Sequence, residues 1–218
     1  MKLYLNYLSP YSQKTLVGLY EKEIAFTPEL VKLGDPEARA AYAKIYPLGK
    51  VPLLALEDGY LVPESTTILE YAEGHFDTGT RLIPADKDQA RRARFFDRQY
   101  DLYVNEAFQR IFFAGDRPGV PPESPNAREV RRIDGAKKTL RTMYDYLDHH
   151  FAKNTWTLGD AFTLADCAAV ALVYARMAVP FDDHPALGHY VGRLVERPSV
   201  ARVLREAAPY MPKFTEGK

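Results

Sequence analysis

The first 76 residues carry two kinds of hydrophobic pattern in turn. In some stretches apolar and polar residues alternate one by one, which predicts strands; in others apolar residues recur every three or four positions, which predicts one face of a helix. The predicted elements, in chain order, are a strand at 3–7, a helix at 10–21, a strand at 26–31, a helix at 36–45, strands at 53–56 and 60–62, and a helix at 64–75. Strands separated by helices favour parallel pairing, so this part is predicted to form an α/β domain.

The last two predicted strands flank Glu57-Asp58-Gly59. An Asp-Gly pair between apolar runs is typical of a tight hairpin, because glycine adopts positive φ angles at little cost. The hairpin adds an antiparallel edge to the sheet, which is therefore predicted to be mixed.

The strand pattern stops after residue 77. Residues 78–85 include Gly79 and Pro84 and predict a linker. Beyond it, spacings of three or four separate Ala93, Phe96, Tyr100, Tyr103, Ala107 and Ile111, which predicts a long amphipathic helix. The Gly- and Pro-rich stretch 115–125 predicts a loop, and further helices are predicted at 126–151, 164–179, 186–196 and 199–207. We therefore expect an α/β domain at 1–77 and an all-helical domain at 86–218.

Composition narrows the possible partners and compartment. The chain has 29 basic and 29 acidic residues, so it lacks the strongly basic balance typical of nucleic-acid binders. Its longest wholly apolar run, Cys167–Ala175, is shorter than the roughly 20 residues of a membrane span. Cys167 is the only cysteine, which fits a reducing compartment. The histidines show no metal-ligand spacing. We expect a cytoplasmic protein with no metal, membrane or nucleic-acid partner.

Ser9-Pro10 stands at the start of the first predicted helix. Serine is a favoured N-cap and proline a favoured first helical residue, so the pair is explained by capping alone. The same geometry also puts a hydroxyl beside free backbone N–H groups and the positive end of the helix dipole, where it can stabilise an anion. Both readings stay open for Ser9.

Glu64-Ser65 begins the third predicted helix, after Pro63 closes a strand. A carboxylate can bind an ammonium group, while a hydroxyl and helix N–H groups can bind a carboxylate. This short segment therefore offers matched partners for the head group of an α-amino acid. Helix capping is the alternative, because an acid near a helix start is favoured in any case.

Val51-Pro52 stands immediately before an apolar strand, where proline is tolerated because it cannot donate a ladder hydrogen bond. Most X-Pro bonds are trans. A cis bond here would direct the N–H and C=O of Val51 outward, available to an extended peptide.

Thr163 and Asp166 have the spacing of a capping box, with Asp in place of Glu. We assign them a structural role at a helix start.

Taken together, four segments resemble the cytosolic glutathione transferase family. They are the strand followed by Ser9-Pro10-Tyr11-Ser12, the stretch Pro47-Leu48-Gly49-Lys50-Val51-Pro52, the stretch Glu64-Ser65-Thr66-Thr67, and Leu158-Gly159-Asp160-Ala161-Phe162-Thr163-Leu164-Ala165-Asp166. The resemblance covers nearly the whole chain. It implies a thioredoxin-like N-terminal domain, an all-α C-terminal domain and a homodimer.

The resemblance also implies roles for particular residues. Val51, before a cis-Pro52, would pair its backbone with the cysteinyl part of glutathione, and Lys50 would lie beside it. Glu64 and Ser65 would hold the γ-glutamyl amino and carboxylate groups. Ser9 would hydrogen-bond the glutathione sulfur.

Ser12 is a close rival for contact with the sulfur, and Tyr4 and Tyr7 are weaker substitutes. The family's asparagine before the loop proline is Tyr46 here, and no cysteine lies near the first helix, so cysteine-type thiol transfer has no nucleophile.

The resemblance implies a glutathione transferase, with glutathione as co-substrate and a hydrophobic electrophile as second substrate. Alternatives are a glutathione-binding module without turnover and a glutathione-dependent peroxidase or isomerase. Aromatic candidates for the second subsite are Tyr100, Tyr103, Phe108, Phe112 and Phe113, although such a stripe is usually packing.

Overall fold

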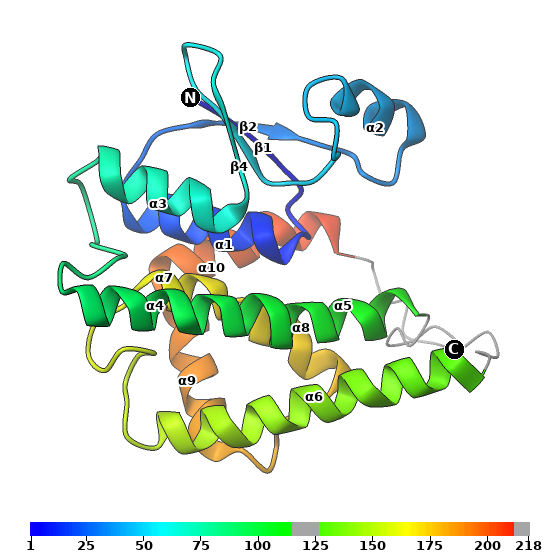
Figure 1. The fold of residues 1–218 in the computed structure, drawn as a ribbon, viewed down its shortest axis with the longest axis vertical. Helices are drawn as coiled ribbons and strands as arrows, with labels where there is room; N and C mark the ends of the chain where they lie inside the picture. Colours follow the sequence, from blue (N-terminus) through cyan, green and yellow to red (C-terminus); the bar gives the residue numbers. More distant parts are fainter. Residues whose placement is uncertain (115–126, 212–218) are drawn as a thin grey trace. The chain divides into compact units, whose positions relative to one another are not determined.

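Figure 1 shows the fold in a computed structural model, which describes residues 1–114 and 127–211. The predicted loop at 115–125 lies outside the described residues. Contacts divide the chain into two compact units. The α/β unit comprises Met1–Ile83 together with Ser199–Met211, and the helical unit comprises Pro84–Pro198. The predicted linker at 78–85 lies where the segment Met1–Ile83 ends. The prediction assigns residues 199–211 to the helical domain, whereas their contacts assign them to the α/β unit.

The α/β unit contains a four-stranded mixed sheet. Its strands are β1 (Lys2–Leu5), β2 (Thr27–Leu30), β3 (Leu53–Ala55) and β4 (Leu61–Pro63), in the order β2-β1-β3-β4. β1 pairs with β2 in parallel, and the other two pairs are antiparallel. Gly59 has a φ of +86° in the connection between β3 and β4. The predicted hairpin and mixed sheet are therefore confirmed.

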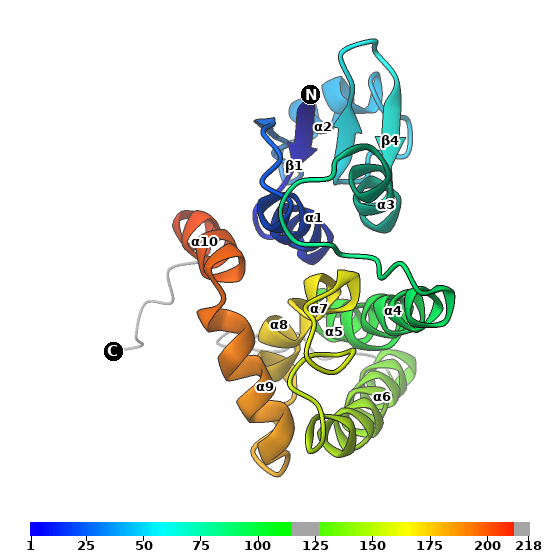
Figure 2. The same ribbon diagram turned by 90° about the vertical axis from the view of Figure 1, so that its left-hand side faces the viewer.

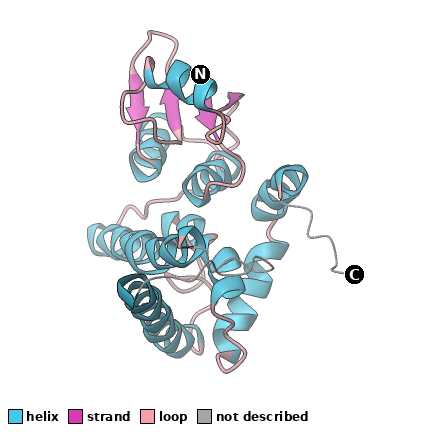
Figure 3. Ribbon diagram, turned by 90° about the vertical axis from the view of Figure 1, so that its right-hand side faces the viewer, coloured by secondary structure: helices cyan, strands magenta, loops and turns pink. Residues whose placement is uncertain are grey.

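Three helices cover the sheet. They are α1 (Pro10–Glu21), α2 (Pro36–Ala43) and α3 (Ser65–His75). Leu3 and Leu5 are fully buried, and the alternating Tyr4 packs instead on Tyr42 of α2, with ring centroids 5.6 Å apart. Alternate residues of a strand point to opposite faces, so β1 buries both faces. In Figures 2 and 3, α1 and α3 lie on one face of the sheet and α2 on the other.

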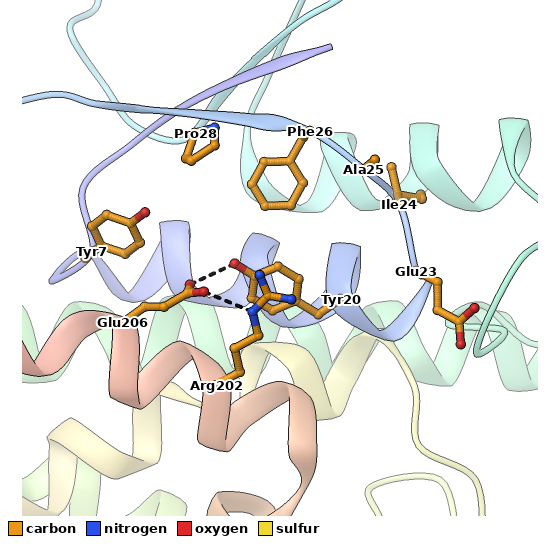
Figure 4. Close-up of a pocket in the computed structure, with 9 residues that line it drawn as sticks. All are labelled: Tyr7, Tyr20, Glu23, Ile24, Ala25, Phe26, Pro28, Arg202 and Glu206. Atoms are coloured by element: carbon orange, nitrogen blue, oxygen red, sulfur yellow. Dashed lines mark hydrogen bonds and ion pairs between the residues drawn. The ribbon is translucent and has the colours of Figure 1, made fainter.

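The last described α-helix, α10 (Pro198–Ala207), packs against α1 although it starts 188 residues later in the chain. The Tyr20 hydroxyl donates to Glu206 Oε2 over 2.7 Å, and the Arg202 guanidinium lies 3.8 Å from the centre of the Tyr20 ring (Figure 4). At the other end, the Ser199 hydroxyl donates to the buried carboxylate of Glu21. These contacts explain why α10 belongs to the α/β unit.

The described part of the helical unit has no named strand. Its helices are α4 (Lys87–Gln99), a π-helical segment (Tyr100–Asn105), α5 (Glu106–Phe113), α6 (Ala127–Phe151), α7 (Leu164–Ala168), α8 (Ala171–Ala178) and α9 (Pro185–Glu196). Among residues 1–114 and 127–211, no helix combines the length and the apolar character needed to cross a bilayer. The predicted all-helical character of this part is confirmed, although the single helix predicted at 164–179 divides into α7 and α8.

The π-helical segment changes which side chains the long helix buries. A regular helix would turn Tyr103 inward, as the spacing predicts, but Tyr103 is 49% exposed and the neighbouring Val104 is fully buried. A π turn contains more residues than an α turn, so it shifts the apolar stripe along the chain. Of the aromatic candidates, Tyr100 and Phe108 are buried in the core and Phe113 is exposed.

Asp166 is fully buried and organises the start of α7. Its Oδ2 accepts hydrogen bonds from the backbone N–H and the hydroxyl of Thr163. The first of these, with the Thr163 side chain accepting the backbone N–H of Asp166, forms the predicted capping box. Its Oδ1 accepts from the backbone N–H and hydroxyl of Thr157 and from the hydroxyl of Tyr190. One carboxylate therefore ties together the loop before α7, the N-terminus of α7 and α9.

Candidate functional site

The strand register brings three separate loops to one edge of the sheet. Tyr4 pairs with Leu53, and Leu53 pairs with Pro63. Both pairings are antiparallel, so the end of β1, the start of β3 and the end of β4 lie side by side. Neighbouring strands are about 4.8 Å apart, so the outer two loops are separated by about 10 Å. Ser9, Val51 and Ser65, which follow or precede these strand ends, are thus gathered along this edge.

Two helix N-termini open at the same edge. α1 starts after β1, and α3 starts after β4. The first turn of each helix leaves backbone N–H groups without intrahelical partners, and the helix dipole adds partial positive charge there. The edge therefore favours negatively charged groups, such as a carboxylate or a thiolate.

Ser9 caps α1 with a geometry that leaves its proton available. Its side chain accepts a hydrogen bond from the backbone N–H of Ser12, with 3.3 Å between nitrogen and oxygen. A hydroxyl has one proton to donate as well as lone pairs to accept with. The capping bond uses a lone pair, so the Ser9 hydroxyl can donate to a bound anion while it caps the helix. Capping and anion binding are thus compatible here.

Ser12, the rival hydroxyl, is fully buried. Its Oγ accepts the backbone N–H of Asn6 over 3.2 Å, which ties the loop after β1 to α1. Ser9 by contrast is partly exposed. Ser9 is therefore accessible from solvent in this structure, whereas Ser12 is not.

The two tyrosines point toward other parts of the α/β unit. Tyr4 packs on Tyr42, on the face of the sheet covered by α2. Tyr7 stacks on Tyr210, which follows α10, with ring centroids 5.1 Å apart. These contacts favour Ser9 over either phenol as the group beside a bound sulfur.

The Val51–Pro52 peptide bond is cis. Val51 is 8% exposed, and its backbone makes no hydrogen bond to the described residues. The preceding carbonyl, that of Lys50, accepts the hydroxyl of Tyr42 over 2.8 Å, which holds the loop on α2. The Lys50 side chain is exposed. The loop thus presents an unused backbone donor and acceptor at Val51 beside an exposed cation.

Glu64 has a φ of +69° and a ψ of +128°, in the region that favours glycine. Such a conformation costs about 1–3 kcal/mol and is concentrated at functional sites. The exposed Glu64 side chain forms no capping bond, and Ser65, only 4% exposed, begins α3. Neither the Glu64 nor the Ser65 side chain forms a hydrogen bond or an ion pair with any of the described residues. Capping alone therefore does not account for this strained acid.

Lys14 is a further cation near this edge, and sequence reasoning did not single it out. It is 1% exposed, and its Nζ donates to Thr66 Oγ1 in the first turn of α3 over 2.8 Å. Its position relative to the apolar residues of the helix was the one sequence feature that indicated burial. Lys14 stands three residues before Val17, on the buried side of α1. This ammonium adds positive charge to the N-terminus of α3.

The remaining chemical candidates lie elsewhere. Cys167 is fully buried in α7, as expected for a packing residue. Among residues 1–114 and 127–211, no group of three or more His, Cys, Asp or Glu side chains has an arrangement suited to a metal ion. The edge formed by Ser9, Val51 and Ser65 is therefore the best-equipped site for an extended ligand with charged ends.

The sequence is similar to known proteins along most of its length. The family model for the glutathione S-transferase N-terminal domain matches residues 8–75, and that for the C-terminal domain matches residues 117–198. A glutathione S-transferase from Pseudomonas putida is 29% identical over 224 aligned residues, covering 99% of this chain and 96% of the relative. Glutathione S-transferase 2 of Saccharomyces cerevisiae is 28% identical, covering 94% of this chain and 89% of the relative.

The fold is also similar to solved structures. A glutathione S-transferase from Methylobacillus flagellatus, solved with GSH bound, superposes with a TM-score of 0.80 at 26% identity, covering 93% of this chain and 98% of the other. The expected thioredoxin-like N-terminal domain and helical C-terminal part are thereby confirmed. The two family models together match well over half of the sequence, and the chain belongs to the glutathione transferase family.

Proposed function

We propose that this protein is a glutathione transferase that activates the glutathione thiol as a thiolate. The observation that carries the proposal is the shared sheet edge, where Ser9, Val51 and Ser65 are brought together by the pairing of β1, β3 and β4. The edge spans about 10 Å, which suits an extended tripeptide. The relatives named glutathione S-transferase, and the one solved with GSH bound, support the same activity.

In this proposal each end of glutathione has its own partners. Glu64 binds the γ-glutamyl ammonium, and Ser65 with the N–H groups of α3 binds the adjacent carboxylate. The backbone of Val51 pairs with the cysteinyl residue, as an added strand would, and Lys50 lies beside it. The Ser9 hydroxyl donates to the sulfur.

The energetics of thiol activation are modest. A thiol of pKa about 8.5 is only about 3% thiolate at pH 7. Lowering the pKa by two units needs about 2.7 kcal/mol of extra thiolate stabilisation. A hydrogen bond to a charged group supplies about 1.5–3 kcal/mol and a helix dipole about 0.3–1 kcal/mol, so together Ser9 and the N-terminus of α1 offer a stabilisation in the range that this shift requires. The thiolate attacks an electrophilic carbon, a sulfur–carbon bond forms, and the leaving group departs with its electron pair.

The proposal includes a hydrophobic electrophile as second substrate, a homodimer and a cytoplasmic location. On the helical unit, Phe95, Tyr103 and Tyr146 are large side chains left between 43% and 49% exposed. Apolar side chains of this size are suited to contact with a second molecule, either substrate or subunit. Buried Cys167, the chain's only cysteine, fits a reducing compartment.

Retention on immobilised glutathione followed by a conjugation assay tests the activity. We expect the protein to be retained, to be eluted by free glutathione and to conjugate 1-chloro-2,4-dinitrobenzene with release of chloride. Retention without conjugation of this or other electrophiles would favour a binding module. Activity confined to peroxides or disulfides would favour the other glutathione chemistry.

Replacement of Glu64 separates binding from stability. In Glu64→Gly the positive φ is no longer strained, so we expect the free energy of unfolding to stay the same or rise by about 1 kcal/mol. The carboxylate is lost, so the dissociation constant for glutathione should rise about tenfold or more, because a charged hydrogen-bond partner is removed. Calorimetric titration with glutathione and urea unfolding measure the two quantities.

Glu64→Gln is the matched control, because it keeps the strain and removes only the charge. It should weaken glutathione binding to a similar extent without a gain in stability. If both variants bind glutathione as the parent does, Glu64 does not contact the ligand.

A further inference from the structure

A single side chain of α2 hydrogen-bonds the backbone of the loop before β3. The Tyr42 hydroxyl donates to the carbonyl of Lys50 over 2.8 Å. Within the described parts of the chain, no other hydrogen bond reaches the two peptide units on either side of Val51, and Pro52 has no N–H to donate. Hydrogen bonding that orients these two units therefore comes from Tyr42.

Tyr42 is held in the core of the α/β unit. It is 4% exposed, and it belongs to a buried cluster with Val31, Val51 and Leu53. Its ring also packs on Tyr4 of β1, with centroids 5.6 Å apart. Burial raises the pKa of Tyr42 well above its ordinary value, so the phenol keeps its proton and acts as a donor. The position of the donor is thus fixed by packing on the sheet.

The carbonyl of Lys50 and the N–H of Val51 belong to one peptide unit. The cis bond of this loop is the next one, Val51–Pro52, so the Lys50–Val51 unit is trans. A trans peptide unit is planar, and its C=O and N–H groups point in opposite directions. A donor that holds the Lys50 carbonyl toward Tyr42 therefore turns the Val51 N–H away from Tyr42. Rotation of the unit would break this hydrogen bond.

We propose that Tyr42 is a positioning residue for glutathione, whose hydroxyl aims the Val51 N–H at the carbonyl of the cysteinyl residue. This inference rests on the proposed function, in which the Val51 backbone pairs with the cysteinyl part. A peptide unit that can rotate binds only in the fraction of molecules that have the right orientation, and the apparent affinity falls by that fraction. Tyr42 is buried, so it acts through the Lys50–Val51 peptide unit.

Tyr42→Phe tests the hydroxyl, because it keeps the ring that packs on Tyr4. We expect the dissociation constant and the KM for glutathione to rise about fivefold, the effect of losing one hydrogen bond. At saturating glutathione, kcat should change less than about twofold, because Ser9 and the N-terminus of α1 are unaltered. Calorimetric titration and steady-state kinetics measure these quantities.

Two shortened ligands distinguish positioning from a general disturbance of the site. γ-Glutamylcysteine and γ-glutamylcysteamine both lack the glycine and keep the γ-glutamyl group, the adjoining amide and the thiol, but only the first keeps the cysteinyl carbonyl oxygen. In Tyr42→Phe, binding of γ-glutamylcysteine should weaken about fivefold, whereas binding of γ-glutamylcysteamine should match the parent within about twofold. An equal loss for the two ligands would overturn the proposal.

Amide hydrogen exchange at Val51, followed by NMR, gives a second measurement that does not depend on turnover. Glutathione should slow exchange of the Val51 N–H in the parent and slow it less in Tyr42→Phe. Equal protection in the two proteins would show that the Tyr42 hydroxyl does not orient this group.

Tyr46→Phe is the matched control. Tyr46 packs against the same cluster, and its hydroxyl makes no hydrogen bond to the described residues, so this variant should bind glutathione as the parent does. If the parent binds glutathione and Tyr42→Phe binds it equally well, the role of Tyr42 is wrong and the proposed function stands. If the parent binds no glutathione, both are wrong.

Discussion

Ser9→Ala is expected to lower turnover at pH 7 about 5- to 15-fold while glutathione still binds. Without the Ser9 hydroxyl, the thiol pKa of bound glutathione returns from about 6.5 to about 8, because the helix dipole of α1 remains, and the thiolate fraction falls from about 75% to about 5–15%. The contacts proposed for Glu64, Ser65 and Val51 are unchanged, so the dissociation constant should change little. Steady-state kinetics measures the turnover, and an ultraviolet titration of bound thiolate measures its pKa.

The pH profile separates this explanation from a structural one. If Ser9 acts on the thiol pKa, the rate of Ser9→Ala should recover as pH rises toward about 9, where bound glutathione ionises without help. A variant that has merely lost its helix cap would be destabilised by about 0.5–2 kcal/mol but would show no such recovery.

Two matched variants complete this test. Ser9→Thr keeps a hydroxyl and a capping oxygen and should retain most of the turnover. Ser12→Ala removes the buried rival hydroxyl, which accepts the Asn6 backbone N–H, and should lower stability more than turnover. A large loss of turnover in Ser12→Ala, with Ser9→Ala active, would transfer the role to Ser12.

Local sequence rules predicted much of the site. Ser9-Pro10 marks the start of α1, Asp58-Gly59 marks the hairpin, and Glu64-Ser65 marks the start of α3, because each depends on a few neighbouring residues. Which loops share a sheet edge depends instead on the pairing of β1 with β3 and of β3 with β4, which joins residues far apart in the chain. Local rules therefore predicted the helix starts at Ser9 and Ser65 but not their common edge, and their roles toward glutathione stay predictions.

Features that depend on distant contacts could not be predicted in this way. The π-helical segment exchanges Tyr103 for Val104 on the buried face, and no spacing rule anticipates it. The spacing of Lys14 puts it on the buried side of α1, but its partner, Thr66 at the start of α3, is 52 residues away in the chain and is not predicted by local rules. Likewise α10 carries the amphipathic pattern of any surface helix, and only its contacts with Tyr20 and Glu21 show that it packs on α1.

Asp166→Ala is expected to lower the free energy of unfolding of the helical unit by about 3–5 kcal/mol. The buried carboxylate accepts five hydrogen bonds, from Thr157, Thr163 and Tyr190. Hydroxyls can rotate toward other acceptors, but the backbone N–H groups of Thr157 and Thr163 cannot, and each unsatisfied buried donor costs about 1–3 kcal/mol. Urea unfolding followed by tryptophan fluorescence is well suited, because Trp156, the only tryptophan, is the residue before Thr157.

Asp166→Asn and Asp160→Ala show whether the hydrogen bonds cause this loss. An asparagine keeps one acceptor oxygen and presents an NH₂ group to the remaining donors, so Asp166→Asn should lose an intermediate amount, about 2 kcal/mol. Asp160 is exposed near the same loop, and its replacement by alanine should change the free energy of unfolding by less than about 0.5 kcal/mol.

If the free energy of unfolding of Asp166→Ala lies within about 1 kcal/mol of the parent value, apolar packing holds the loop and α7, and the hydrogen bonds of the carboxylate contribute little. A loss in Asp166→Asn as large as that in Asp166→Ala would instead show that the negative charge matters more than the number of acceptors.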